Sequence, residues 1–212
     1  MTETLVHRPV DQKRFRRTLA LHATGVVVVT ARVDGRPVGL TATSFAPVSQ
    51  DPPLVSFSAD RSSATWPDLA QADLFAVNLL AGHQAVIADR FARNDIDRFA
   101  VPTAWHSGPA GVPLLEEVTA HLLAVPHGTV EIGDHTLVVG LVIGTRTGHG
   151  SAPLVYHDGK FASLWGDSSL WRGDPPHPPQ SASSASSLAA LPAVALDAPR
   201  RPRLRRRSAT AT

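Results

Sequence analysis

Two groups of hydroxyl side chains lie close together in the sequence, and their chemistry suits the binding of a phosphate or a polar ring. The first group is Thr41, Thr43 and Ser44, and the second is Ser58, Ser62, Ser63 and Thr65. Serine and threonine hydroxyls donate and accept hydrogen bonds without bringing a full charge. Arg61 adds one positive charge to the second group. The alternative is that Thr41 and Thr43 are ordinary strand residues, because threonine favours strands.

Several other chemistries have no support in the sequence. There is no cysteine, which excludes disulfides, thiolate metal sites and cysteine nucleophiles. A GxGxxG turn after a strand and a GxxxxGK loop followed by Ser or Thr are both absent, so neither familiar phosphate-binding turn is predicted. HExxH and GxSxG are also absent, and the ten histidines are scattered. We therefore expect no metal site and no serine hydrolase.

The elements that must position the hydroxyl groups are two extended runs, residues 38–48 and 54–58. Residues 50–53 form the turn between them, since Pro52 and Pro53 have no N–H for a strand ladder. Upstream, residues 26–33 are rich in β-branched side chains and predict a strand. Asp34-Gly35 then predicts a hairpin, because both central positions of a type I′ turn need positive φ. The run 38–48 is expected to be the second arm of that hairpin.

The rest of the chain adds short strands and few helices. Asp11 is a good N-cap for a first helix, and further helices are expected at 65–72 and 83–92. Strands are expected at 74–80, 114–125, 129–132, 135–147, 153–157 and 160–164, with tight turns at Gly133-Asp134 and Asp158-Gly159. About eight short strands with regular turn signals are typical of a closed antiparallel barrel. The predicted fold class is therefore mainly β, with a few short flanking helices.

Length and composition predict one folded domain and a tail. The chain has 212 residues, of which 43% are hydrophobic, and this suits one domain of about 150–170 residues with something extra. We expect a flexible N-terminus at 1–10, the folded domain at 11–166, and a disordered tail at 167–212, where Pro, Ser, Ala and Arg dominate without apolar periodicity. No window holds the roughly 18–20 apolar residues of a membrane span, and no secretory signal is visible. A cytoplasmic protein is expected.

The net charge of +2 hides an uneven distribution. Residues 167–212 hold seven arginines and three aspartates, so the tail is basic while residues 1–166 are mildly acidic. A basic body for binding nucleic acid is therefore not expected. The run 200–207 leaves open an electrostatic attachment to nucleic acid through the tail, which would show a steep salt dependence. The alternative interpretation of this arginine run is a solvated tail without function.

Several segments, in their order and spacing, resemble the flavin reductase family of the FMN-binding split barrel. The resemblance covers roughly residues 10–165. It rests on the segments Thr24–Thr30, Gly39–Phe45, Ser49–Val55, Phe75–Leu80, Phe91-Ala92, Asp97-Arg98-Phe99, Gly133-Asp134-His135 and Pro153–Tyr156. It implies a Greek-key split barrel that acts as an NAD(P)H:flavin oxidoreductase, with FMN or FAD and NADH or NADPH as cofactors.

The resemblance also implies site residues. The segment matching 41–44 would line the flavin ring and ribityl chain, and the segment matching 58–65 would hold the phosphate side. The implied cofactor-binding residues are Thr41, Ala42, Thr43, Ser44, Ser58, Ala59, Arg61, Ser62, Ser63, Thr65, Asn78, Arg90 and Phe91. For Asn78 the sequence leaves two roles open, which are pairing with a backbone edge and contacting the flavin. A helix-end salt bridge for Arg90 and core packing for Phe91 are the alternatives to flavin contact.

His135 is the sharpest single candidate, because the family's turn histidine is proposed to contact the pyridine nucleotide. It is the expected catalytic and nicotinamide-binding residue, with Asp134 shaping the turn or orienting the imidazole. Tyr156 is a further expected nicotinamide contact, and His157 and Lys160 flank the same hairpin. The alternative is a water-exposed turn histidine. Trp66, Trp105 and Trp165 are expected to be packing anchors.

The function that follows from the resemblance is hydride transfer from nicotinamide C4 to flavin N5. The reduced flavin would then pass to a partner flavin-dependent monooxygenase. The family implies a homodimer with the flavin near the subunit interface. The alternative function is a non-catalytic module that binds flavin or haem, with the arginine-rich tail as an interaction arm. The sequence leaves open the choice between FMN, FAD and riboflavin, and between NADH and NADPH.

Overall fold

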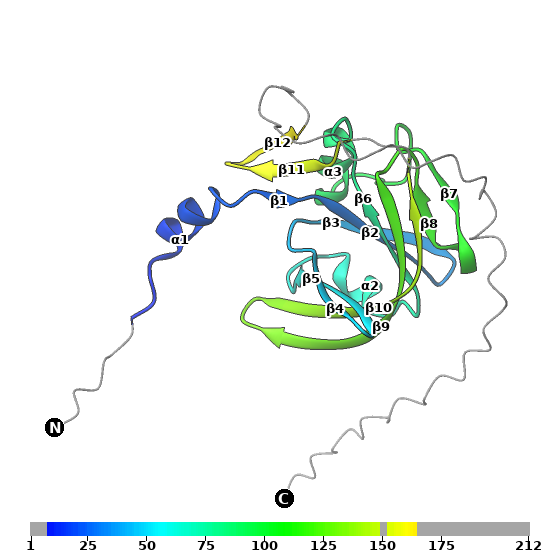
Figure 1. Cartoon of the computed structure of the whole chain (residues 1–212), viewed down its shortest axis with the longest axis horizontal. Helices are drawn as coiled ribbons and strands as arrows, with labels where there is room; N and C mark the ends of the chain where they lie inside the picture. The colour runs from blue at the N-terminus through cyan, green and yellow to red at the C-terminus, as the bar shows by residue number, and fades with distance from the viewer. Residues whose placement is uncertain (1–7, 149–151, 165–212) are drawn as a thin grey trace, which may run out of the picture. The chain divides into compact units, whose positions relative to one another are not determined.

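The computed structural model describes residues 8–148 and 152–164, and these form mainly antiparallel strands (Figure 1). The helices are α1 (Gln12–Leu19), α2 (Trp66–Leu69) and α3 (Ala85–Ala92), with a 3₁₀ turn at Pro109–Gly111. The strands are β1 (Thr24–Gly25), β2 (Val27–Val33), β3 (Arg36–Ala42), β4 (Ala46–Gln50), β5 (Pro53–Asp60), β6 (Phe75–Leu79), β7 (Trp105–Ser107), β8 (Pro113–Leu115), β9 (Ala120–Ile132), β10 (His135–Thr147), β11 (Leu154–His157) and β12 (Lys160–Ser163). The tail at 167–212, Trp165 and residues 1–7 lie outside the described residues.

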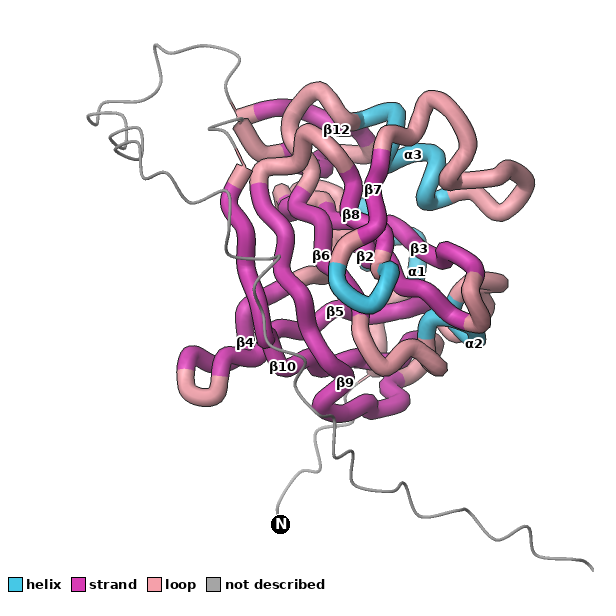
Figure 2. Tube along the Cα trace, turned by 90° about the vertical axis from the view of Figure 1, so that its right-hand side faces the viewer, coloured by secondary structure: helices cyan, strands magenta, loops and turns pink. Residues whose placement is uncertain are grey.

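The described strands pair in three sheets, and every ladder is antiparallel. The main sheet has seven strands in the order β3-β2-β6-β9-β10-β5-β4, while β1-β11-β12 and β7-β8 form two smaller sheets. The longest strands, β9 and β10, run side by side through the main sheet (Figure 2). The predicted class, mainly β with a few short helices, is confirmed.

The main sheet is open in its hydrogen bonding. β3 and β4 are its outer strands, and within the described part of the chain no ladder joins them. The closed ladder expected from the sequence is therefore not found. The two outer strands are nevertheless joined by residues 43–45 alone, and four Cα steps span at most about 14 Å. The sheet must therefore curl until the end of β3 lies near the start of β4.

The expected single arm at 38–48 was wrong, because it is two strands on opposite edges of the sheet. β3 pairs with β2 as far as Ala42, which lies opposite Val27. β4 pairs with β5 instead, with Ala46 opposite Ser56. The chain stops pairing with β2 and begins pairing with β5 across residues 43–45, and the alternation of side chains is interrupted there. The hydroxyl group at 41–44 therefore straddles a corner of the sheet.

The three predicted two-residue turns are confirmed. Asp34 and Gly35 have φ of 48° and 75°, and Asp158 and Gly159 have φ of 47° and 75°. These are the positive values that a type I′ turn requires. Gly133-Asp134 joins β9 to β10, with Ile132 opposite His135. The Gly133-Asp134 turn sets the position of His135.

The boundaries predicted around β9 were wrong in two places. The expected strand at 114–125 is divided at a turn where Glu117 has φ of 60°, a conformation that sequence patterns rarely reveal in a residue other than glycine. The expected break between 125 and 129 is absent, because β9 continues through Pro126. Pro126 lies opposite Gly140 at a shift of register, beyond the last residue that pairs with β6. Its missing N–H therefore costs no ladder bond on that side.

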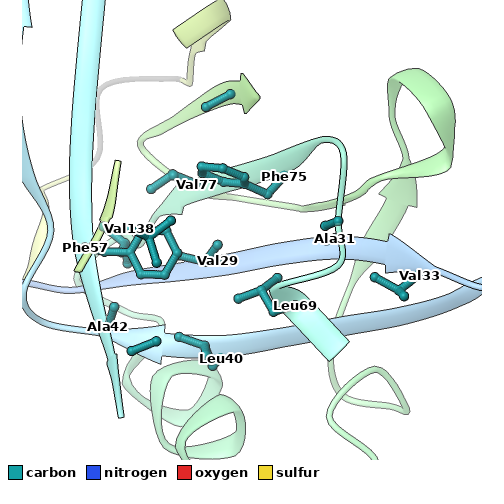
Figure 3. Close-up of a cluster of buried hydrophobic side chains, with 14 residues drawn as sticks. Val29, Ala31, Val33, Leu40, Ala42, Phe57, Leu69, Phe75, Val77 and Val138 are labelled. Carbon is teal, nitrogen blue, oxygen red and sulfur yellow. The ribbon is translucent and has the colours of Figure 1, made fainter. Parts of the chain in front are cut away.

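The core lies on both faces of β2. Val27, Val29 and Ala31 join one buried cluster, while Val28 joins a second cluster with Leu80. Figure 3 shows the first cluster, in which Phe57 and Phe75 meet edge to face with ring centroids 5.8 Å apart. A strand buried on both faces needs apolar side chains at almost every position, which explains the valine run at 26–29.

The first two helices begin where the sequence predicted, but α2 ends at Leu69 rather than near residue 72, and α3 begins at Ala85 rather than at residue 83. Asp11 accepts hydrogen bonds from the N–H groups of Lys13 and Arg14 and caps α1. No residue of α1 is buried. Two tryptophans pack as expected: Trp66 lies against the first core cluster, and Trp105 contacts the ring of Phe99 and donates to its carbonyl.

Candidate functional site

The structure brings the Gly133-Asp134-His135 turn against the end of β5. His135 lies opposite Asp60 in the β5–β10 ladder, and the backbone N–H of Arg61 donates to the carbonyl of Asp134 at 3.0 Å. The predicted histidine is thus next to the segment 58–65. Asp60 and His135, which are 75 positions apart in the sequence, therefore share one corner of the molecule.

The two hydroxyl groups are joined directly by Ser44 and Ser58. The Oγ of Ser44 accepts from the backbone N–H of Ser58 at 2.8 Å and lies 3.3 Å from the Ser58 carbonyl oxygen, to which it can donate. Thr43, the neighbour of Ser44, is exposed, and its side chain makes no hydrogen bond to the described residues. The corner at 43–45 therefore lines the same surface as the end of β5.

His135 has one ring nitrogen engaged by the protein. Its Nδ1 lies 2.7 Å from Oδ1 of Asp134, and its side chain is about 43% exposed. The hydrogen bond and the charge of His135 hold the pKa of Asp134 below its ordinary value. An ionised Asp134 favours a proton on Nδ1, which leaves Nε2 to meet a ligand.

Asp60 and Ser62 form a local turn that uses part of the predicted binding group. The N–H and the hydroxyl of Ser62 both donate to Oδ1 of Asp60 at 2.7 Å, and these bonds lower the pKa of Asp60. The N–H and the hydroxyl of Ser62 are therefore both engaged by Asp60. The Oγ of Ser63 instead accepts from the N–H of Thr65, so the Ser63 hydroxyl keeps its proton for another acceptor.

Arg61 ties the β9–β10 turn to β5. Its Nη1 lies 3.5 Å from Oε2 of Glu131 and donates to the carbonyl of Gly133 at 3.3 Å. The guanidinium is half exposed, so its ion pair with Glu131 contributes little to stability. The expected charge contact with a cofactor phosphate stays a prediction.

Thr65 is buried and accepts a hydrogen bond from Nη1 of Arg98. It also borders a pocket of about 240 Å³ between the start of β3, the start of α2 and the loop after α3. The pocket lining includes Gly39, Asp97 and Arg98, and Thr65 is the only residue predicted for the cofactor that borders it. His135 does not line this pocket.

Thr41 and Asn78, two of the predicted cofactor residues, make their hydrogen bonds within the protein. Thr41 donates to the carbonyl of Ala88 on α3 at 2.6 Å. The amide of Asn78 is fully buried, donates to the Val28 carbonyl and to Thr30 Oγ1, and accepts from the N–H of Leu115. This geometry favours the backbone-pairing alternative for Asn78.

Phe91 and Arg90 likewise serve the fold. Phe91 is 1% exposed and packs edge to face against Phe99, in agreement with the core-packing alternative. Nη2 of Arg90 donates to the carbonyls of Asp97 and Ala100, so Arg90 bonds to a loop instead of making the helix-end salt bridge that was the alternative to flavin contact. Ala42 and Ala59 are also buried, so they can offer a ligand little beyond their backbone groups.

Tyr156 belongs to another sheet than His135. It lies opposite Thr24 in the β1–β11 ladder and contacts the ring of Phe161 in a tilted arrangement, with ring centroids 5.2 Å apart. His157 and Lys160 are exposed beside it on the same hairpin. Within the described residues no ladder connects this hairpin to β5 or β10, so the expected nicotinamide contact of Tyr156 stays a prediction.

Two residues at the site received no role from the sequence. Asp60 shapes the turn at 60–63, and its place two residues before Ser62 is a sequence signal for such a turn. Arg98 holds Thr65, but no local pattern reveals that contact, because the two residues are 33 positions apart. In the part of the chain that the structure describes, no three His, Asp or Glu side chains gather to hold a metal ion. No described helix is long and apolar enough to cross a membrane.

Comparisons with known proteins identify the family of this chain. The family model "Flavin reductase like domain" matches residues 19–164. An NADH:FMN oxidoreductase of Rhodococcus erythropolis is 39% identical over 151 residues, which cover 69% of this chain and 79% of the relative. The reductase subunit HsaB of a flavin-dependent monooxygenase from Rhodococcus jostii is 33% identical over 168 residues, which cover 78% and 86% of the two chains.

Solved structures give the same result. The NADH:FAD oxidoreductase SgcE6 of Streptomyces globisporus, in complex with NAD and FAD fragments, superimposes with a TM-score of 0.69 at 32% identity, over 76% of this chain and 99% of that one. The protein is thus an oxidoreductase built on an antiparallel β-sheet. The chain belongs to the flavin reductase like domain family.

Proposed function

We propose that this protein reduces a flavin with a nicotinamide nucleotide and delivers the reduced flavin to a flavin-dependent monooxygenase. One observation carries the proposal: the His135 turn lies against the hydroxyl-rich end of β5, with His135 opposite Asp60. A reaction between two ring systems requires two binding surfaces that meet. The relatives named as NADH:FMN oxidoreductases and as monooxygenase reductase subunits support the same reaction and the same kind of partner.

The donor set at the site fits the ribityl and phosphate groups of a flavin. Ser63 and Thr65 hold their hydroxyl oxygens as acceptors within the protein, so both protons are free for an outside acceptor. Thr43 is exposed beside Ser44. Neutral donors bind a phosphate more weakly than an arginine fork does, which suits a flavin that must leave after reduction. We assign Thr43, Ser44, Ser63 and Thr65 to flavin binding.

When bound, the flavin supplies the redox chemistry by accepting at N5 a hydride from C4 of the nicotinamide. The chain's part is to hold the two rings in contact. His135 binds the nucleotide through Nε2, and Asp134 fixes the ring through Nδ1. Backbone N–H groups at the corner 43–45 are the proposed partners for negative charge on the ring edge.

Three further features belong to this proposal. The curled sheet forms a split barrel, with the Ser44–Ser58 bonds bridging the gap between β3 and β5. A homodimer covers the open surface around His135, as the family resemblance implies. FMN and NADH form the first pair to test, because the Rhodococcus relatives are named for them, and FAD comes next because the SgcE6 structure holds FAD fragments. The expected cytoplasmic location stays a prediction.

The test is steady-state oxidation of NADH and NADPH by the purified chain, with FMN, FAD or riboflavin added. We expect turnover that depends on added flavin and that survives removal of residues 172–212. Nucleotide oxidation would be followed by its absorbance, with a boiled sample as the control. Absence of turnover with all six combinations would contradict the proposed function and favour a non-catalytic binding module.

A further inference from the structure

Arg98 connects three separate parts of the chain at the edge of the proposed flavin site. Its guanidinium donates from Nη1 to the Gly39 carbonyl on β3 at 2.8 Å and to Oγ1 of Thr65 at the start of α2. From Nε it donates to the Arg93 carbonyl at 2.6 Å, and from Nη2 to Oδ1 of Asn94 at 2.7 Å. Four of its five N–H groups are therefore engaged by the protein.

The charge of Arg98 is not neutralised by an ion pair. All four acceptors are carbonyl, amide or hydroxyl oxygens, and no carboxylate of the described residues lies within ion-pair distance of the guanidinium. Its side chain is partly buried, and this burial lowers the pKa of Arg98, although arginine keeps its charge at neutral pH. Asp68 and Asp97 line the same pocket, so the pocket as a whole does not attract an anion.

The contact with Arg98 determines what the Thr65 hydroxyl can do. A hydroxyl that accepts from a guanidinium must turn its own proton elsewhere, and the positive neighbour makes that proton a stronger donor. Thr65 is 8% exposed, and its Oγ1 donates to no acceptor among the described residues. Its proton is thus available to an oxygen of a ligand beside segment 62–65.

We infer that Arg98 is a positioning residue for the phosphate of the flavin, acting through Thr65 rather than by direct contact. This inference rests on the proposed function, since it assumes that segment 62–65 meets the flavin phosphate. Arg98 fixes the start of α2 against β3 and orients the Thr65 hydroxyl as a donor. Its removal would then weaken the binding of flavins that carry a phosphate and spare riboflavin, which carries none.

The experiment compares the dissociation constants of FMN and riboflavin, measured by quenching of flavin fluorescence, for the full chain and its variants. For Arg98→Gln we expect FMN binding to weaken about tenfold, as for a lost hydrogen bond to a charged group, with riboflavin binding within twofold of the unaltered chain. Thr65→Val, nearly equal in shape, should give the same selective loss. The double variant should lose no more than either single variant, because both changes remove one relay.

Arg93→Gln is the matched control. Arg93 is in the same loop, but its side chain pairs with Asp95 at the surface, so both dissociation constants should stay unchanged. Equal losses for FMN and riboflavin in Arg98→Gln would show a merely structural role and overturn the inference. A folded Arg98→Gln variant with an unaltered FMN-to-riboflavin ratio would overturn it as well.

If Arg98→Gln does not fold, the same comparison of FMN and riboflavin binding is made with Arg98→Lys. A lysine ammonium cannot meet all four acceptors in their fork geometry, so a selective loss for FMN of about threefold is expected, and an unaltered ratio would contradict the inference. Failure of the proposed function looks different. In that case the unaltered chain shows no flavin-dependent oxidation of NADH or NADPH, whereas failure of the Arg98 role leaves the turnover and the flavin binding of the unaltered chain normal.

Discussion

The polar residues predicted for one cofactor site separate into two sets with different surroundings. The inner set, Thr41 and Asn78, is engaged by carbonyl and N–H groups of neighbouring strands and α3. The outer set, Thr43, Ser63 and His135, faces an open surface and keeps donors or acceptors free. Residue type alone does not separate the two sets, because each of them holds a threonine, which favours strands. Only the position of each residue relative to the corner at 43–45 separates structural polar groups from those available to a ligand.

The largest effect is expected in the inner set, for Asn78→Leu. This change leaves the N–H of Leu115 without its buried acceptor and removes a donor from Val28 O and Thr30 Oγ1. We expect the free energy of unfolding to fall by about 2–4 kcal/mol, measured by urea denaturation. Thr43→Val, at an exposed position, is the control and should change stability by no more than about 0.5 kcal/mol. Similar stability losses for both variants would erase the distinction between the two sets.

His135→Ala should act on the nucleotide and leave the fold intact. Removing the ring takes away Nε2, so the KM for NADH should rise about tenfold, which corresponds to about 1.4 kcal/mol. Flavin affinity should change by less than about twofold. Steady-state kinetics at saturating flavin measures the first quantity. His127→Ala removes an exposed histidine from β9 away from the turn and should leave KM unaltered; a KM in His135→Ala equal to that of the unaltered chain would exclude the assigned role.

Ser44→Ala tests the bridge between the two hydroxyl groups. The N–H of Ser58 would lose its acceptor at 2.8 Å, and one hydrogen bond near the surface contributes about 1 kcal/mol. We expect a loss of that size in thermal or urea unfolding, together with flavin affinity a few fold weaker. Ser44→Thr keeps the hydroxyl and should restore both. If Ser44→Thr behaves like Ser44→Ala, the bridge is not what the hydroxyl provides.

The smallest effect concerns pH. The pKa of Asp134 is lowered in the folded chain by His135, so the carboxylate contributes stability above its ordinary pKa of 3.8 and loses it as the pH falls through the lowered value. The unaltered chain should therefore lose more stability below about pH 4 than Asp134→Asn does. Urea midpoints measured from about pH 5 down to pH 3 would show the difference. Parallel curves for the two chains would mean that the pair does not form.

Much of the fold could be predicted because local rules and tertiary structure agree. The turns at Asp34-Gly35 and Asp158-Gly159 need positive φ at residues that tolerate it. The strand β10 has the predicted bounds, His135–Thr147. The corner at 43–45 could not be predicted, since it depends on which neighbour each half of the run 38–48 finds. The passage of β9 through Pro126 depends likewise on where β6 ends.

Some residues of the candidate site could be identified from the sequence, but their contacts could not. The hydroxyl stretch and the His135 turn were both identified, and the structure places them together. The sequence could not show that the donors of Ser62 go to Asp60, nor that the Thr65 hydroxyl accepts from Arg98. Hydrogen-bond partners are set by three-dimensional proximity, which spacing along the chain does not reveal.

The central claim is that the outer set holds a flavin and a nicotinamide together, and anaerobic mixing tests it most directly. Purified chain with FMN would be mixed with NADH, in excess over the flavin but below the KM for NADH, and the loss of the oxidised flavin's absorbance at about 450 nm would be followed. We predict complete bleaching with the unaltered chain, and bleaching about tenfold slower for His135→Ala at low NADH. Absence of bleaching with the unaltered chain, or equal rates for the two proteins, would contradict the account.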